Sequence, residues 1–465
     1  MTDQTAETAT PKTRNSLWGN AREMAQLAPP ERNRWVDFLR ALSILAVVIG
    51  HWLVAAPYID GAGDIQGGHL LGILPWSQWL TWGFQVMPIF FLVGGYSNGV
   101  SWGAQLRRVE DGERPLGLYR DWFASRVQRL INPVFPVLLL WAVLALILTQ
   151  FGIERGTVKM ATQLALVPVW FLAVYLLVTA ITPLSLWAWR RFGFRSFFLL
   201  LAAAAFADRF FLIEGSSFLH FANFLFVWVG IHQLGYAWLD GAFKDTKLRI
   251  VWFIASLASL IALTFILDLY PVAMIGVPGA EMTNSMPPTL ALLLLGMAQT
   301  GLVLALEPWG RKWLDNINVW TATVLMNGMI MTVYLWHLTA FVLVMVAAWM
   351  AGGIGLEMFP GTGSWWWTRP VWFALYILTL LPMIAAFAKH ERSFGPIRGG
   401  RTVPKARVVF GVAMICVGLA MTAAISIASP EGISGVRIWV VALPFVGAAL
   451  LGFGPVYKML TGHKA

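Results

Sequence analysis

The first long apolar segment of the chain carries the residues whose types and spacing could do chemistry. Arg40 and His51 are eleven positions apart, which in an α-helix is close to three turns and about 16 Å, so both side chains project from nearly the same face. Histidine can take a proton near neutral pH, and arginine can orient a carbonyl or stabilise an oxyanion. Asp37 lies one turn before Arg40 and can pair with it. The structural alternative is that Arg40 reaches lipid headgroups and His51 hydrogen-bonds a neighbouring helix.

Three further pairs of polar residues share a helix face. The first pair, Tyr334 and His337, is either catalytic or a hydrogen-bonding pair of the core. The second pair, Arg126 and Arg129, can bind phosphate groups because guanidinium binds phosphate through two nitrogens, or can simply anchor the topology. The third pair, His220 and Asn223, can line a cleft for a substrate.

The composition predicts that these residues lie in a membrane. Hydrophobic residues make up 58% of the 465 positions and charged residues only 12%, whereas soluble domains carry about 25% charge. A membrane-spanning helix needs about 20 mostly apolar residues. Twelve segments qualify, which predicts an all-α, polytopic helix bundle: 36–56, 78–100, 134–151, 162–187, 196–214, 219–240, 250–268, 288–306, 320–350, 371–388, 408–429 and 437–457. The segment 320–350 is too long for one upright span, so it tilts or begins with an interfacial piece.

The basic residues predict the orientation of these segments. If both termini are cytoplasmic, 27 of the 33 Lys and Arg residues fall on the inner side, two lie within spans, and the outer side has only four. The four outer residues are Arg155, Lys159, Arg369 and Arg437. The net charge of +10 therefore reflects topology, and nucleic acid is not expected as a partner. Residues 1–33 lack an apolar core for a cleaved signal peptide and are expected to form a flexible cytoplasmic tail.

A series of short motifs, in order along the chain, resembles the acyltransferase-3 family of membrane O-acyltransferases. Arg40, ten residues and then His51 in the first span resemble the signature of that family. The other matches resemble its "LDxLRxL", "FFxxSGF", "RxxRLxP", "WFLxxL" and "YLxH" segments. They lie at 36–42, 88–96, 126–133, 170–175 and 334–337.

The resemblance implies an enzyme that moves an acyl group from acyl-CoA to a hydroxyl of an envelope glycan, glycolipid or related acceptor, in the cell membrane. It covers a domain of residues 34–390 with a ten-helix core, and residues 391–465 add two helices and a short tail. It implies that Trp170 and Tyr175 contact substrate, and that Arg126 and Arg129 hold the phosphates of coenzyme A. No bound cofactor is expected beyond acyl-CoA as donor. Gly94 departs from the family because serine is common there, and Ser97 nearby does not replace it.

Other classes of protein have less support in the sequence. No HExxH, CxxC, P-loop or strand-linked GxGxxG motif occurs, so metal, redox, ATP and dinucleotide roles are not expected. A secondary transporter is an alternative because twelve spans with both ends inside is a common layout. However, the second half of the chain has no counterpart of the Arg–His span. A flippase for lipid-linked sugars, without transfer activity, is a further alternative.

Overall fold

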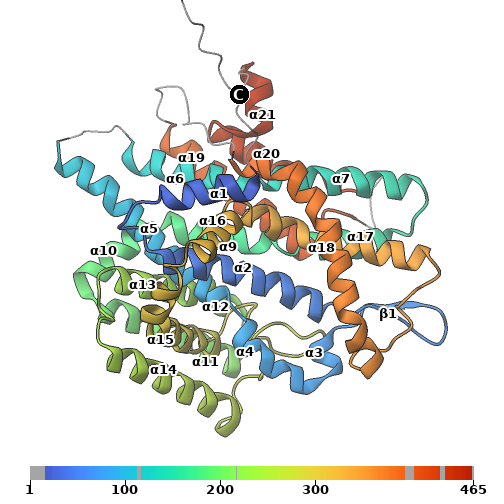
Figure 1. The fold of residues 1–465 in the computed structure, drawn as a ribbon, viewed down its shortest axis with the longest axis horizontal. Coiled ribbons are helices and arrows are strands. Elements are labelled where there is room, and N and C mark those ends of the chain that lie inside the picture. Colours follow the sequence, from blue (N-terminus) through green and yellow to red (C-terminus); the bar gives the residue numbers. More distant parts are fainter. Residues whose placement is uncertain (1–15, 113–116, 216, 393–402, 430–434, 463–465) are drawn as a thin grey trace, which may run out of the picture.

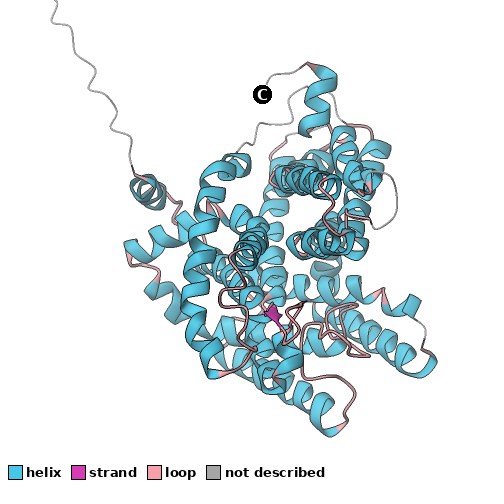
Figure 2. Ribbon diagram, turned by 90° about the vertical axis from the view of Figure 1, so that its right-hand side faces the viewer, coloured by secondary structure: helices cyan, strands magenta, loops and turns pink. Residues whose placement is uncertain are grey.

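The computed structural model describes residues 16–112, 117–215, 217–392, 403–429 and 435–462, and within them the chain is a bundle of α-helices (Figures 1 and 2). The described strands are β1 (Tyr58–Ile59) and β2 (Ile65–Gln66), which form one short antiparallel hairpin. The predicted all-α fold is confirmed.

By length and composition, eight helices of the described chain can each span a membrane, or up to eleven spans exist if each bent helix pair counts as one. The chain is therefore a multi-pass membrane protein, while the predicted number of twelve is not established. The eight are α2 (Arg34–Val54), α11 (Phe194–Glu214), α13 (Asn223–Leu239) with the short α12 (Ser217–His220) before it, α14 (Thr246–Ile261) with the π-turn η2 (Ala262–Ile266), α15 (Leu290–Trp313), α17 (Ile330–Met350), α18 (Gly363–Arg392) and α19 (Lys405–Ile425).

Three pairs of helices are bent at a short break, and each pair can form one span. Pro133 and Pro168 stand at two of the breaks, which bend by 42° each, because proline cannot donate the backbone hydrogen bond that a continuous helix needs. The third break bends by 58°. The pairs are α6 (Leu118–Ile131) with α7 (Val134–Gln150), α8 (Arg155–Leu166) with α9 (Val169–Ala180), and α20 (Ile438–Leu450) with α21 (Gly454–Thr461).

Two other predicted segments are divided. The long segment 320–350 separates at Gly328 into α16 (Ile317–Asn327) and α17. The segment 78–100 becomes α4 (Leu80–Phe84) and α5 (Met87–Glu110), and α5 is not among the helices that pass as apolar spans. The remaining elements are α3 (Leu70–Ile73), η1 (Pro75–Trp79) and α10 (Thr182–Phe192).

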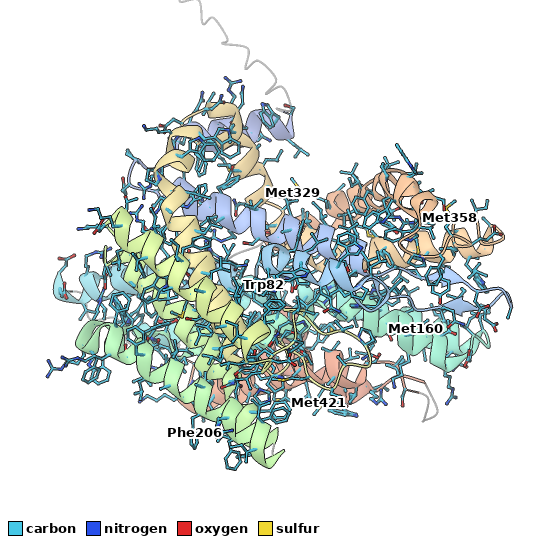
Figure 3. All side chains as sticks on the ribbon, turned by 90° about the horizontal axis from the view of Figure 1, so that it is seen from below. Trp82, Met160, Phe206, Met329, Met358 and Met421 are labelled. Carbon is cyan, nitrogen blue, oxygen red and sulfur yellow. The ribbon has the colours of Figure 1, made fainter. Side chains whose placement is uncertain are left out.

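The helices differ sharply in how much of their surface is buried. The most apolar window is 78% buried in α15 and 72% in α17, but only 22% in α11 and 17% in each of α14 and α18. Large apolar side chains such as Phe206 therefore point outward at the rim of the bundle (Figure 3). Apolar surface on this scale is not stable in water, so α11, α14 and α18 face lipid while α15 and α17 form the interior.

The N-terminal segment differs from the flexible tail that the sequence predicts for residues 1–33. Residues 1–15 lie outside the described residues, but α1 (Leu17–Gln26) is an ordered helix that packs on α16. Ser16 caps it, and the indole of Trp320 donates a hydrogen bond of 3.0 Å to the carbonyl of Ala25. An amphipathic helix can bury its apolar face against a neighbour, which sequence polarity alone conceals.

The two C-terminal helices belong to the same bundle as the rest. α19 packs along α9, and it forms a tight hairpin with α20 in which Gly411 and Gly447 face each other. A Cβ atom at Gly411 would lie 2.7 Å from the carbonyl oxygen of Gly447, so only glycine permits this approach.

Helix ends gather at two opposite ends of the bundle. At one end, which we call the basic end, α14 begins with Lys247 and Arg249 and α15 ends with Arg311 and Lys312. The guanidinium of Arg249 donates to the carbonyl of Leu304 in α15 and so joins the two helices. At the opposite end, Ala55 after α2 pairs with His69 before α3, and Figure 1 shows β1 on the far side of the molecule from α10.

A buried carboxylate joins several helices away from the first span. Asp208 of α11 is 1% exposed. Its oxygens accept hydrogen bonds from Asn223 Nδ2 (2.6 Å), the Tyr270 hydroxyl (2.8 Å) and the Leu290 amide (2.7 Å), and His220 Nε2 lies 3.2 Å away. These partners fix both ends of the segment between α14 and α15.

Cysteine labelling tests the orientation of the bundle. In a variant whose native Cys416 is replaced by alanine, Asp64→Cys should react with a membrane-impermeant maleimide on intact cells. Asp111→Cys should react only after permeabilisation, because the distribution of basic residues predicts that the basic end faces the cytoplasm. Both aspartates are exposed, so they form a matched pair. The reverse pattern would contradict the orientation.

Substitution of Asp208 tests whether its contacts stabilise the fold. Asp208→Asn should lower the thermal unfolding temperature of the purified protein by several degrees, since breaking a buried charged network costs about 3–5 kcal/mol. Arg209→Ala, at the adjacent exposed position, should leave that temperature almost unchanged. Equal temperatures for the two variants would mean that the Asp208 contacts contribute nothing net.

Candidate active site

His51 and His337 form the centre of the candidate site, although 286 positions separate them. His51 Nδ1 lies 2.8 Å from His337 Nε2, and the two rings are within 10° of parallel. His337 Nδ1 lies 2.6 Å from the carbonyl oxygen of Tyr334. A carbonyl can only accept, so His337 Nδ1 carries a proton; with both imidazoles neutral, His337 Nε2 accepts from His51 Nδ1–H. The lone pair of His51 therefore lies on Nε2, which has no partner among the described contacts.

Three helices hold this pair in position. The indole of Trp52 donates to the carbonyl of His337 over 3.1 Å, which links α2 to α17 a second time. The hydroxyl of Tyr334 donates over 2.8 Å to the carbonyl of Pro168, at the break between α8 and α9. His337 and Tyr334 are buried, whereas His51 is partly exposed. Tyr334 thus orients His337 through its backbone carbonyl, and its hydroxyl anchors the pair to α9.

Arg40 lies in a separate polar cluster nearer the basic end. Its Nη1 donates to Asp37 Oδ1 (3.1 Å), which confirms the predicted pairing on one helix face. The other carboxylate oxygen of Asp37 accepts from Arg32 Nε over 2.6 Å. Arg40 Nη2 donates to the hydroxyl of Ser97 on α5 over 2.8 Å. These contacts hold the Arg40 guanidinium near the start of α2, about 16 Å along the helix from His51, and no contact between the two side chains is described.

The polar side chains of α5 continue this cluster toward α6. Asn98 Oδ1 accepts from Arg126 Nε over 3.2 Å, and Asn98 Nδ2 lies 3.2 Å from His232 Nε2. The guanidinium of Arg126 also contacts the Ser101 hydroxyl and lies over the Trp122 ring. Arg126 therefore turns into the bundle.

The two arginines of the "RxxRLxP" match do not share one environment. Arg126 is only partly exposed, whereas Arg129, one turn later on α6, is exposed. The contacts of Ser97 with Arg40 and of Asn98 and Ser101 with Arg126 were not predicted, because serine and asparagine in a membrane helix give no pattern of their own.

Tyr175 accounts for the glycine that departs from the family motif. A Cβ atom at Gly94 would lie 2.8 Å from Tyr175 Cε2 and 2.9 Å from its hydroxyl. The tyrosine ring therefore occupies the space that a serine side chain would need. Tyr175 also contacts Phe171, whose ring packs against Tyr334 and Trp170. The α9 residues Trp170 and Tyr175 thus line the interior between the two polar clusters.

Two predicted substrate residues lie elsewhere. His220 and Asn223 contact Asp208, and none of the contacts described for them reaches Arg40, His51 or His337. In the part of the chain that the structure describes, no group of three His, Cys, Asp or Glu residues could hold a metal ion.

The comparison with known proteins agrees with the motifs. A model of the acyltransferase-3 family, described as an acyltransferase domain, matches residues 33–389, which leaves out α19, α20 and α21. Neither the curated proteins nor the solved structures contain a match to the chain. Because the family model covers most of the sequence, this multi-pass protein belongs to the acyltransferase-3 family of membrane acyltransferases.

Proposed function

We propose that the protein is an O-acyltransferase that moves an acyl group from acyl-CoA to a hydroxyl of an envelope glycan, glycolipid or related acceptor at the cell membrane. The observation that carries the proposal is the chain of hydrogen bonds from His51 through His337 to the Tyr334 carbonyl. It fixes one proton on each imidazole and directs a free lone pair, at His51 Nε2, away from the pair. A hydroxyl acceptor needs such a base because it is a weak nucleophile at neutral pH.

The reaction then conserves protons. The acceptor hydroxyl attacks the thioester carbonyl while His51 Nε2 takes its proton. The tetrahedral intermediate collapses, the carbon–sulfur bond breaks, and the thiolate of coenzyme A takes the proton from His51. During the charged stage His51 Nδ1–H still donates to His337 Nε2, so the pair stabilises the imidazolium as the orienting partner does in a catalytic triad.

The donor is assigned to the basic end. Arg126 and Arg129 lie on the same helix, and guanidinium groups bind phosphate through two nitrogens. Arg126 is partly buried and has no carboxylate partner among the described residues, which supports an anionic ligand. Arg40 is about 16 Å along α2 from His51, so we assign it to the donor and not to the oxyanion. The acceptor hydroxyl would approach His51 from the opposite end.

Substitution of the base tests the mechanism. His51→Gln should reduce acyl transfer by about 10²–10⁴-fold, because glutamine can hydrogen-bond but cannot take a proton. The measurement is transfer of labelled acyl groups from acyl-CoA to envelope material in membranes with matched protein levels. His390→Gln at the end of α18 serves as the control. Near-full transfer by His51→Gln would exclude His51 as the base, and absence of transfer in the native protein would favour a transporter or flippase.

The donor assignment has its own test. Arg126→Ala with Arg129→Ala should raise the apparent KM for acyl-CoA by about tenfold or more, because charge-assisted hydrogen bonds to phosphate are lost. Lysine at both positions should restore the affinity only in part, since it lacks the planar fork. Lys247→Ala, exposed at the same end, is the control. An unchanged KM in the double variant would return both arginines to a role in topology.

A further inference from the structure

A buried arginine lies at the end of the bundle where basic residues are scarce. Arg369 is in the second turn of α18 and is 8% exposed. Its guanidinium carbon lies 4.0 Å from the ring centroid of Trp365 and 5.6 Å from that of Trp372. Its Nε donates to the carbonyl of Trp365 over 3.1 Å. The cation is therefore held in a fixed place by two indole rings.

This cation has no counter-ion within the described chain. Arg40 and Arg311 each pair with a carboxylate, whereas no ion pair is described for Arg369. Its Nη2 has only a long contact of 3.4 Å to the Thr368 hydroxyl, and no acceptor is described for Nη1. Burial of a charge is costly unless an opposite charge or several hydrogen bonds compensate it. The two rings replace only part of the lost hydration, so the outer edge of the guanidinium lacks an anion.

The position excludes a simple lipid anchor. A basic side chain that reaches up to the headgroups keeps its charge in water, but this guanidinium lies under two indoles. Trp365 is 1% exposed and packs against Ala56 and Leu70, just beyond the end of α2. Trp372 closes over Gly355, in the loop that also contains Met358 (Figure 3). The walls around Arg369 are thus built from three separate segments.

A series of contacts links the site to the histidine pair. Tyr376 follows Arg369 by two helical turns, about 10 Å. Its ring packs against Trp52 with centroids 5.2 Å apart. Trp52 is adjacent to His51 in sequence and donates to the carbonyl of His337. An anion at Arg369 would therefore sit farther than His51 from the basic end, beyond the end of α2.

We propose that Arg369, between Trp365 and Trp372, binds a phosphoryl group of the molecule that carries the acceptor hydroxyl. The planar fork of guanidinium matches two phosphoryl oxygens, and indole walls that exclude water strengthen that pairing. Lipid-linked sugars and lipid headgroups both carry phosphoryl groups, and the chemistry of binding is the same for either. The role in acceptor binding rests on the proposed acyl transfer, but the binding itself does not.

Binding can be measured without any transfer assay. Full-length protein purified in dodecyl maltoside, without phosphate, is titrated calorimetrically with glucose 1-phosphate and with glycerol 3-phosphate. Arg369→Gln should weaken binding by about tenfold or more, and Arg369→Lys by less, because lysine keeps the charge but loses the fork. Lys159→Gln removes another charge at the same end and should bind as the native protein does. If Arg369→Gln does not purify, Arg369→Lys supplies the comparison.

The outcomes separate the two sources of the phosphoryl group. Tighter binding of glucose 1-phosphate identifies a sugar phosphate, whereas equal or tighter binding of glycerol 3-phosphate identifies a lipid headgroup. Native affinity in both Arg369 variants, or an equal loss in Lys159→Gln, would overturn the site. Arg369-dependent binding in a protein without acyl transfer would retain the anion site and reject the proposed function alone.

Discussion

An ionised side chain persists inside an apolar helix bundle only where other groups of the protein compensate its charge, and much of this structure follows from that constraint. Asp37 shows it at the start of α2, where one carboxylate joins Arg32 and Arg40. Glu391 at the end of α18 accepts from the backbone amides of Met331 and Thr332, and so caps α17. Asp37 therefore helps to fix the start of α2, and Glu391 fixes the start of α17 against the end of α18.

The same constraint shapes the candidate site. Neutral imidazoles can be buried if both ring nitrogens are accounted for, and the His51–His337–Tyr334 arrangement accounts for three of the four. The remaining nitrogen belongs to the less buried ring, where a substrate can reach it. This geometry requires α2 and α17 to be neighbours, and the hydroxyl of Tyr334 ties both to α9. A shift of any one of these helices would separate the base from its partner.

The C-terminal helices bear on the site through α9. The family match ends at residue 389, yet α19 packs along the helix that carries Trp170 and Tyr175. The thiol of Cys416 on α19 contacts the carbonyl of Ala173 on α9, at 3.6 Å. The added pair thus supports a helix of the family domain from one side, so it is part of the bundle that positions the site.

The sequence alone determined the features that depend on neighbours along one helix. Composition predicted a helical membrane protein, and the three-residue spacing predicted the contact between Asp37 and Arg40, because helical periodicity relates residues a turn apart. It also predicted that His51 and Arg40 share a face but lie about 16 Å apart. The order of the short motifs along the chain pointed to the family whose model then matched.

Only the tertiary structure decided which helices meet. The contacts of His51 with His337, of Arg40 with Ser97, and of Asp208 with Tyr270 join residues 57 to 286 positions apart. No periodicity in one helix encodes them, because an apolar surface packs against many possible partners with similar energy. Likewise His220 and Asn223 were expected on one helix face, whereas they lie at the end of α12 and the start of α13. Both contact Asp208 and not the histidine pair. Spacing fixes the direction of a side chain on its own helix, whereas packing between helices selects what that side chain meets.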